Sequence, residues 1–232
     1  MILTNKQIEY LFDFCRQHFV QYYDVQVELV DHLANAVEVE MVADDKLSFE
    51  KAVEKIHRSF GVMGFAPLVA EKQKIAKKQS RKLFWNIFKN QFHWPKVITF
   101  FLLCAFMFTL FSVKLFLIKW FYVAIMIGSL GMLFPLFILQ RIVANTGKKF
   151  LIINFSWISS LVFLPTNLLN ISRLFKDQSF LEYTTSNFLI LGMSIFLSLF
   201  IITLIAVWQT LSSVKSTLYQ NYPEVFTYEK IY

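Results

Sequence analysis

Four ionisable side chains that could bind a partner or a metal lie in one stretch near the amino terminus: Glu28, Asp31, His32 and Glu38. On a helix, Glu28 and His32 are four residues apart and share a face, with Asp31 beside them. Such a cluster could bind a divalent cation, with His57 added if folding brings it close, or titrate near neutrality. The spacing lacks the His-Glu-x-x-His pattern of zinc hydrolases. The simpler interpretation is a solvated acidic face, so we expect no metal and no cofactor.

A second group of polar side chains lies within an apolar stretch farther along the chain. Its members are Asn154, Ser160, Asn167 and Asn170. Amides and hydroxyls at such positions can line a substrate path. More often they bond across helices, or satisfy backbone that a nearby proline has loosened. The apolar stretches carry no buried charge of the kind that ion-coupled transport needs, and no phosphate-binding glycine loop or nucleophile motif is present. We therefore expect no enzyme activity.

These polar groups must be positioned by four apolar stretches that contain no Asp, Glu, Lys, Arg or His. The stretches are Val97–Val113, Trp120–Gln140, Phe150–Ile171 and Phe188–Leu211. Crossing the hydrocarbon core of a bilayer takes roughly 20 helical residues. The first stretch reaches this length if it continues to Ile118, with Lys114 extending toward the headgroups. The sequence predicts four transmembrane helices over residues 97–118, 120–140, 150–171 and 188–211, within a membrane domain of residues 96–212.

Small residues within these stretches suggest where the membrane helices pack. Gly128 and Gly131 lie in the second stretch, and Ser194 and Ser198 form a small-xxx-small pair in the fourth. Small side chains allow two helix backbones to approach closely. We expect these four residues to mediate helix packing, either within one chain or in a homo-oligomer.

The amino-terminal part, residues 1–71, is predicted to be a bundle of helices. Thr4 is a good helix N-cap, and Gln7 completes a capping box, so a helix is expected over residues 5–20. Apolar side chains at helical spacing predict a second helix over residues 24–43 and a third that begins after Ser48 and ends at Gly61. This region carries 12 Asp or Glu against 6 Lys or Arg, so it is strongly acidic.

A helix is predicted to begin at Ala66 and to continue toward Asn90. Its basic amphipathic part, in the juxtamembrane region of residues 72–95, is expected to join this bundle to the membrane domain. Its charged and aromatic residues suit lipid headgroups and the membrane interface: Lys77, Lys78, Arg81, Lys82, Lys89, Trp85 and Trp94. A simple juxtamembrane anchor is the favoured interpretation. A mobile lever or a lipid sensor is the alternative.

Charge also predicts the orientation in the membrane. The part of the chain after residue 71 carries 17 Lys or Arg against 4 Asp or Glu. If both termini are cytoplasmic, most of these cations lie in cytoplasmic segments, as the positive-inside rule requires. We expect a multi-pass protein of the bacterial cytoplasmic membrane that contacts lipid, with a cytoplasmic aromatic tail over residues 213–232. Because the soluble part is acidic, we expect no nucleic-acid binding.

The amino-terminal region resembles the small helical HAAS domain, which is related to the DUF1700 group. The matching segments are Glu28-Leu-Val-Asp-His32, Ser48-Phe-Glu-Lys-Ala-Val-Glu-Lys-Ile-His-Arg-Ser-Phe-Gly61 and Pro67-Leu-Val-Ala70. The resemblance covers about residues 3–75 and none of the membrane region. It implies a helical domain that precedes membrane helices and serves as a sensor or a regulatory partner, often encoded beside a PadR-type repressor.

The sequence therefore predicts an all-α integral membrane protein with a cytoplasmic helical bundle and four spans. The leading hypothesis is a non-enzymatic regulator or accessory subunit. In it, the acidic face at Glu28, Asp31, His32 and Glu38 binds a basic protein partner, and the 72–95 helix couples the bundle to the membrane. The alternative is a small transporter or channel that uses the polar face of the third span.

Overall fold

The computed structural model describes residues 3–112, 118–153 and 187–226. Every element within these ranges is a helix, which confirms the predicted all-α class. The chain divides into two compact units. Unit 1 comprises Met1–Lys78 together with Val143–Asn154, and unit 2 comprises Gln79–Ile142 with Phe155–Tyr232.

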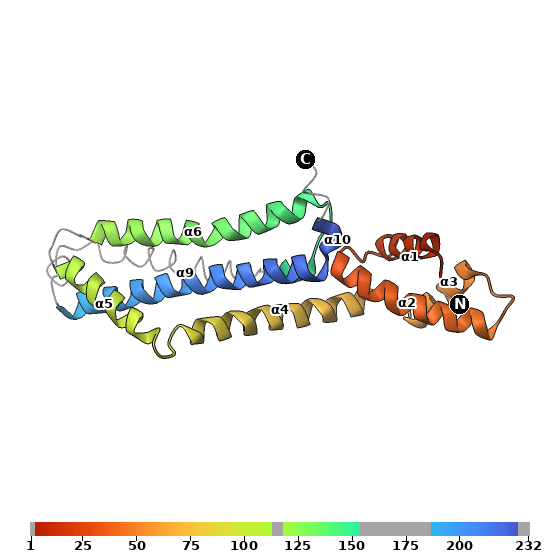
Figure 1. The fold of residues 1–232 in the computed structure, drawn as a ribbon, viewed down its shortest axis with the longest axis horizontal. Coiled ribbons are helices and arrows are strands. Elements are labelled where there is room, and N and C mark those ends of the chain that lie inside the picture. The colour runs from red at the N-terminus through yellow and green to blue at the C-terminus, as the bar shows by residue number, and fades with distance from the viewer. Residues whose placement is uncertain (1–2, 113–117, 154–186, 227–232) are drawn as a thin grey trace. The chain divides into compact units, whose positions relative to one another are not determined.

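The first helix of unit 1, α1 (Asn5–Gln17), begins as its sequence predicts and ends earlier (Figure 1). Thr4 and Gln7 form the expected capping box. At the other end, Phe19 N donates to Arg16 O at 3.1 Å and Val20 N donates to Cys15 O at 3.0 Å. This pair of hydrogen bonds is a Schellman motif, which stops the helix by placing its C′ residue in the left-handed region. Because that residue is Phe19 rather than glycine, the sequence gives little warning of the stop.

The next two helices are α2 (Tyr23–Ala43) and α3 (Phe49–Ser59). Helix α2 packs against both α1 and α3, and α3 contacts α1 through the ring pairs Tyr10–Phe49 and Phe14–His57. Ser48 caps α3 as expected, by accepting a hydrogen bond from Lys51 N. Gly61 follows with a φ of 78°, which suits a residue without a Cβ atom. The shared core consists of fully buried apolar side chains: Leu11, Cys15, Val20, Leu29, Leu33, Val37, Ala52, Val53 and Phe65.

The segment Val143–Asn154 joins unit 1 although it is distant in sequence. It contains the end of α6 (Ile118–Asn145), a turn at Gly147 and the short 3₁₀ helix η1 (Leu151–Ile153). Leu151 is only 4 % exposed and belongs to the same hydrophobic cluster as the core of the bundle. The prediction that a membrane helix begins at Phe150 is therefore wrong for residues 150–153. The remainder of the expected third span lies outside the described residues.

Unit 2 contains long apolar helices whose bounds differ from the predicted spans. They are α5 (Val97–Ser112), α6 (Ile118–Asn145) and α9 (Asn187–Asn221). The basic helix α4 (Ala66–Asn90) has the bounds predicted from the sequence and contains the division between the two units. The short helix α10 (Pro223–Phe226) follows α9, so the first part of the expected tail is helical.

Among the described residues, one helix has the length and composition to cross a membrane. It covers Ile190–Asn221, 32 residues, and its most apolar window has a mean hydropathy of 2.7. The helical segments Val97–Ser112 and Leu133–Asn145 are apolar but shorter. Since α9 has 35 residues at 1.5 Å of rise each, it is longer than a hydrocarbon core requires.

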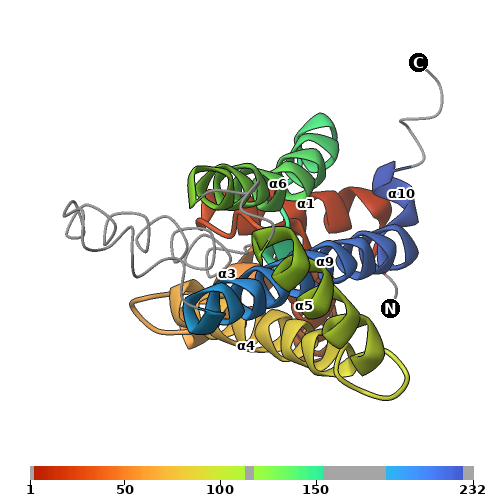
Figure 2. The ribbon, with the colours of Figure 1, turned by 90° about the vertical axis from the view of Figure 1, so that its left-hand side faces the viewer.

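Helix α9 packs through a row of residues four apart, next to α5 (Figures 1 and 2). The row contains the buried residues Ser194, Ser198, Ile202, Ala206 and Thr210. The Ser194 and Ser198 hydroxyls donate to the carbonyls of Ile190 and Ser194, both at 2.7 Å. Each hydroxyl is thus satisfied within its own helix, and the small side chains leave room for a neighbour. This arrangement agrees with a packing role for both serines.

The two glycines of α6 differ in their surroundings. A Cβ atom at Gly128 would lie 2.5 Å from the Cε1 atom of Phe200 on α9, whereas one at Gly131 would meet nothing within 4 Å among the described residues. Gly128 therefore permits close contact between α6 and α9. Gly131 makes no such contact with the part of the chain that the structure describes.

We expect Gly128→Val to lower the thermal midpoint of the purified protein, because overpacking of this kind costs about 1–3 kcal/mol. Gly131→Val is the matched control and should leave the midpoint nearly unchanged. Thermal unfolding of both variants in one detergent provides the comparison. Equal effects would mean that Gly128 is not at a packing contact.

Candidate coupling site at Gln21–Asp24

The candidate site is the contact between the start of α2 and the Val143–Asn154 segment, within unit 1. The backbones meet at a bridge between Tyr22 and Lys149. Tyr23 N donates to the carbonyl of Lys149 at 2.7 Å. The Lys149 ammonium donates to the Gln21 side-chain carbonyl at 3.3 Å. Main-chain pairing thus fixes the register of the two segments.

Asp24 holds the distant segment through its carboxylate. Leu151 N lies 3.0 Å and 2.9 Å from the two carboxylate oxygens, and Ile152 N donates to Oδ2 at 3.2 Å. These are the free N–H groups at the beginning of η1, so Asp24 acts as an N-cap that belongs to another part of the chain. Val25 N donates to the same carboxylate at 3.1 Å. Burial raises the pKa of the Asp24 carboxyl, and the backbone donors of Leu151, Ile152 and Val25 oppose that shift.

Tyr23 provides the aromatic part of the contact. The ammonium of Lys148 lies 3.6 Å from the centre of the Tyr23 ring, a distance at which a cation is attracted to the ring face. Phe150 meets the same ring edge-on, with 5.6 Å between centres. Phe12 of α1 stacks on it at 6.0 Å. One tyrosine therefore contacts both α1 and the docked segment.

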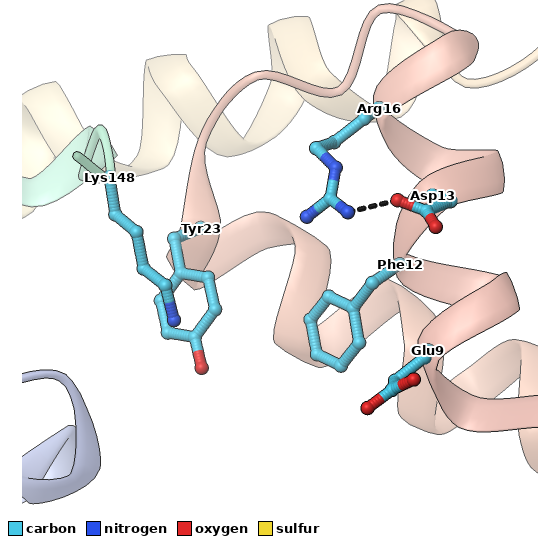
Figure 3. A pocket seen from close by; sticks show the side chains of 6 residues that line it. All are labelled: Glu9, Phe12, Asp13, Arg16, Tyr23 and Lys148. Atoms are coloured by element: carbon cyan, nitrogen blue, oxygen red, sulfur yellow. Dashed lines mark hydrogen bonds and ion pairs between the residues drawn. The ribbon is translucent and has the colours of Figure 1, made fainter. Parts of the chain in front are cut away.

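A cleft of about 350 Å³ lies beside this tyrosine. Figure 3 shows its lining, which is Glu9, Phe12, Asp13 and Arg16 of α1, with Tyr23 and Lys148. Arg16 and Asp13 form an ion pair across one side of the cleft. The lining combines both signs of charge with two rings. Any group that entered the cleft would contact Tyr23 and Lys148, which are members of the coupling site.

The four predicted acidic-face residues do not form one free surface. Glu28 makes an ion pair with Lys72 of α4. Glu38 accepts a hydrogen bond from Leu3 N at 2.9 Å and so anchors the amino terminus of the described chain. Asp31 and His32 are exposed to solvent. Two of the predicted partner-binding residues thus make intramolecular contacts, and Asp31 and His32 remain the candidates for an external one.

His57 packs against α1. Its ring lies 4.2 Å from that of His18 and edge-on to those of Phe14 and Phe65, at 5.3 Å and 4.8 Å. Within the described residues its Nε2 atom is buried without a hydrogen-bond partner. A Cβ atom at position 64 would lie 2.9 Å from this nitrogen, so glycine is needed there. Desolvation lowers the pKa of His57, and the neighbouring His18 lowers it further.

This environment predicts that acid destabilises unit 1. The unfolded chain binds a proton at His57 near pH 6.5, whereas the folded protein binds it only at a lower pH. Stability should therefore fall as the pH drops below about 6.5 and continue to fall until the folded pKa is reached. His18 is the titratable group that packs against His57. Thermal midpoints between about pH 7.5 and about pH 5.5 measure the slope, and His57→Gln should flatten it. An unchanged slope in that variant would assign the effect to another group.

The other predicted site residues fall into two sets. Those of the basic juxtamembrane region are exposed, and all but Trp94 lie on α4: Lys77, Lys78, Arg81, Lys82, Lys89, Trp85 and Trp94. Those of the intramembrane polar face lie outside the described residues: Asn154, Ser160, Asn167 and Asn170.

Sequence reasoning missed Tyr23, Asp24 and Leu151 as site residues. The segments they join are 127 residues apart, and the local sequence of neither segment predicts its contact with the other. A carboxylate in the first turn of a helix is common, because it interacts favourably with the helix dipole, so Asp24 does not stand out in the sequence. The one available signal was Asp24 itself, since a carboxylate there can cap a second helix as well as its own.

Comparison with protein-family models, curated proteins and solved structures finds no match to this chain. The resemblance of the amino-terminal region to the HAAS domain remains a prediction from its sequence.

Proposed function

We propose that this chain is a non-enzymatic membrane regulator or accessory subunit. Its amino-terminal helices bind a protein partner, and the coupling site transmits that binding to the membrane helices. The observation that carries the proposal is the Asp24 cap on Leu151 and Ile152. It ties the helical bundle to the connection that follows the apolar helix α6.

Apolar surface supports a membrane location for unit 2. Large apolar side chains are exposed along all three long helices: Ile98, Phe101, Leu102 and Phe106 on α5, Ile127, Phe134 and Phe137 on α6, and Leu191, Ile195 and Ile205 on α9. Contact of such surfaces with lipid is favourable, whereas their exposure to water is unfavourable. In the proposed arrangement of four spans with both termini cytoplasmic, the bundle and the Val143–Asn154 segment share one side of the membrane. Their contact requires that both lie on the same side of the membrane, which the proposed arrangement provides.

The coupling follows from a population shift between docked and released forms. A partner that binds the bundle more tightly in one form moves the equilibrium toward it by the difference in affinity. Because the docked segment continues from α6, its release frees the end of that helix. Partner binding at the bundle is therefore the signal, and the release of the connection after α6 is the response.

Partner capture from native membranes tests the function. The tagged protein is purified in mild detergent, and co-eluting proteins are quantified by mass spectrometry. We expect a stoichiometric partner, with capture reduced about tenfold or more by Asp31→Lys, because charge reversal opposes a basic partner. Asp45→Lys makes the same charge change in the exposed loop before α3 and should capture normally. A clean homo-oligomer without a partner would contradict the proposal and favour transport through the polar third span.

A further inference from the structure

The turn after α1 exposes a phenylalanine in a conformation that favours glycine. Phe19 has a φ of 65° and is 84 % exposed. A bulky side chain in the left-handed region is strained, and glycine would close the same Schellman motif without that strain. Exposure leaves the ring with little packing to offset the strain. The stability of the fold therefore does not explain why this position holds a phenylalanine instead of a glycine.

A second exposed apolar turn lies next to it, between α3 and α4. Val62 is fully exposed and Met63 is 70 % exposed, between the two glycines of the turn. The two turns are neighbours, because His18 directly before Phe19 contacts His57 near the end of α3. Phe65, directly after the second turn, packs against both histidines.

Phe19, Val62 and Met63 thus form an apolar tip made by two adjacent turns. The nearest cations on the preceding helices are already paired, Arg16 with Asp13 and Arg58 with Glu54. The edge of the tip is therefore electrically balanced, although residues 1–71 carry a net negative charge. Charge would therefore not attract an anionic surface to the tip. The exposed apolar side chains would instead favour contact with an uncharged apolar medium.

We propose that this tip inserts into the bilayer that holds unit 2, so that the helical bundle has a second attachment to the membrane. The inference rests on the membrane location in the proposed function but not on the protein partner. The occupant is lipid because exposed side chains on turns can enter a bilayer interface without a complementary pocket. A membrane-capable helix in the same chain keeps that bilayer at high effective concentration. Insertion is driven by apolar area, so it does not require anionic lipid.

Fluorescence quenching by lipid tests the proposal on the full chain in phosphatidylcholine vesicles. A polarity-sensitive dye is attached at Val62→Cys, with Lys46→Cys in the exposed loop before α3 as the matched control. Cys104 is replaced by alanine. The buried Cys15 can stay, since burial raises the pKa of its thiol to about 12 and keeps it unreactive.

Dye at position 62 should be quenched by spin-labelled lipid, and dye at position 46 should not. Phe19→Gly should reduce the quenching at position 62 by about half or more, while the thermal midpoint stays equal or rises because the strain is relieved. Added anionic lipid should change little. Equal quenching at positions 62 and 46, in neutral and anionic vesicles alike, would overturn the proposal. Partner capture can succeed or fail independently of this result.

Discussion

Replacing Asp24 with alanine is expected to release the Val143–Asn154 segment from the amino-terminal helices. The substitution removes the acceptor for Leu151 N and Ile152 N and leaves both donors without it in a partly buried site. Hydrogen bonds to a charged acceptor contribute about 1.5–3 kcal/mol each, and an unsatisfied buried donor costs a similar amount. We expect a loss of about 2–4 kcal/mol in the docking free energy. Amide hydrogen exchange at residues 149–153 should then accelerate about 100-fold.

The matched control for this experiment is Asp13→Ala. Asp13 is also an acidic residue of unit 1, but its carboxylate is exposed and pairs with Arg16. Its loss should leave exchange at residues 149–153 unchanged. Asp24→Asn should give an intermediate rate, because the amide keeps one acceptor oxygen and loses the charge. If the amides of residues 149–153 exchanged at the wild-type rate in Asp24→Ala, packing alone would hold the segment. The Asp24 carboxylate would then not be needed for docking.

Local features of the bundle were predictable because they depend on neighbouring residues. The capping box at Thr4 and Gln7, the Ser48 cap and the glycine at position 61 all act within one helical turn, and the structure has each of them. The end of α1 was predicted too late because its left-handed residue is Phe19. A pattern that expects glycine at that position cannot identify such a stop.

The site was less predictable because its contacts are non-local. Glu28 and Glu38 were correctly placed on α2, yet their partners are Lys72 and the backbone of Leu3. Helical periodicity gives the face on which a side chain lies and not the element that meets it. Phe150–Ile153 matched the apolar pattern of a span for a similar reason. An apolar residue that fills a distant core has the same sequence signature as one that faces lipid.

Leu151→Ala is expected to destabilise the amino-terminal bundle, although the substitution lies far outside it in sequence. The side chain is 4 % exposed within the core that α1, α2 and α3 share. Truncating a buried leucine to alanine costs about 2–5 kcal/mol, because a cavity replaces the lost methyl groups. Protection of core amides in α1 and α2 measures the effect. Ile152→Ala, at a less buried neighbouring position, is the control and should cost less.

Combining Leu151→Ala with Asp24→Ala distinguishes a cooperative contact from two independent ones. If the carboxylate and the leucine hold one segment as a unit, the first substitution releases it and the second has little left to remove. The double variant should then lose less stability than the sum of the two single variants, by about 1 kcal/mol or more. Additive losses would mean that Leu151 stays in the core when the cap is gone. In that case partner binding near Asp24 could not release the α6 connection, and coupling would need another route.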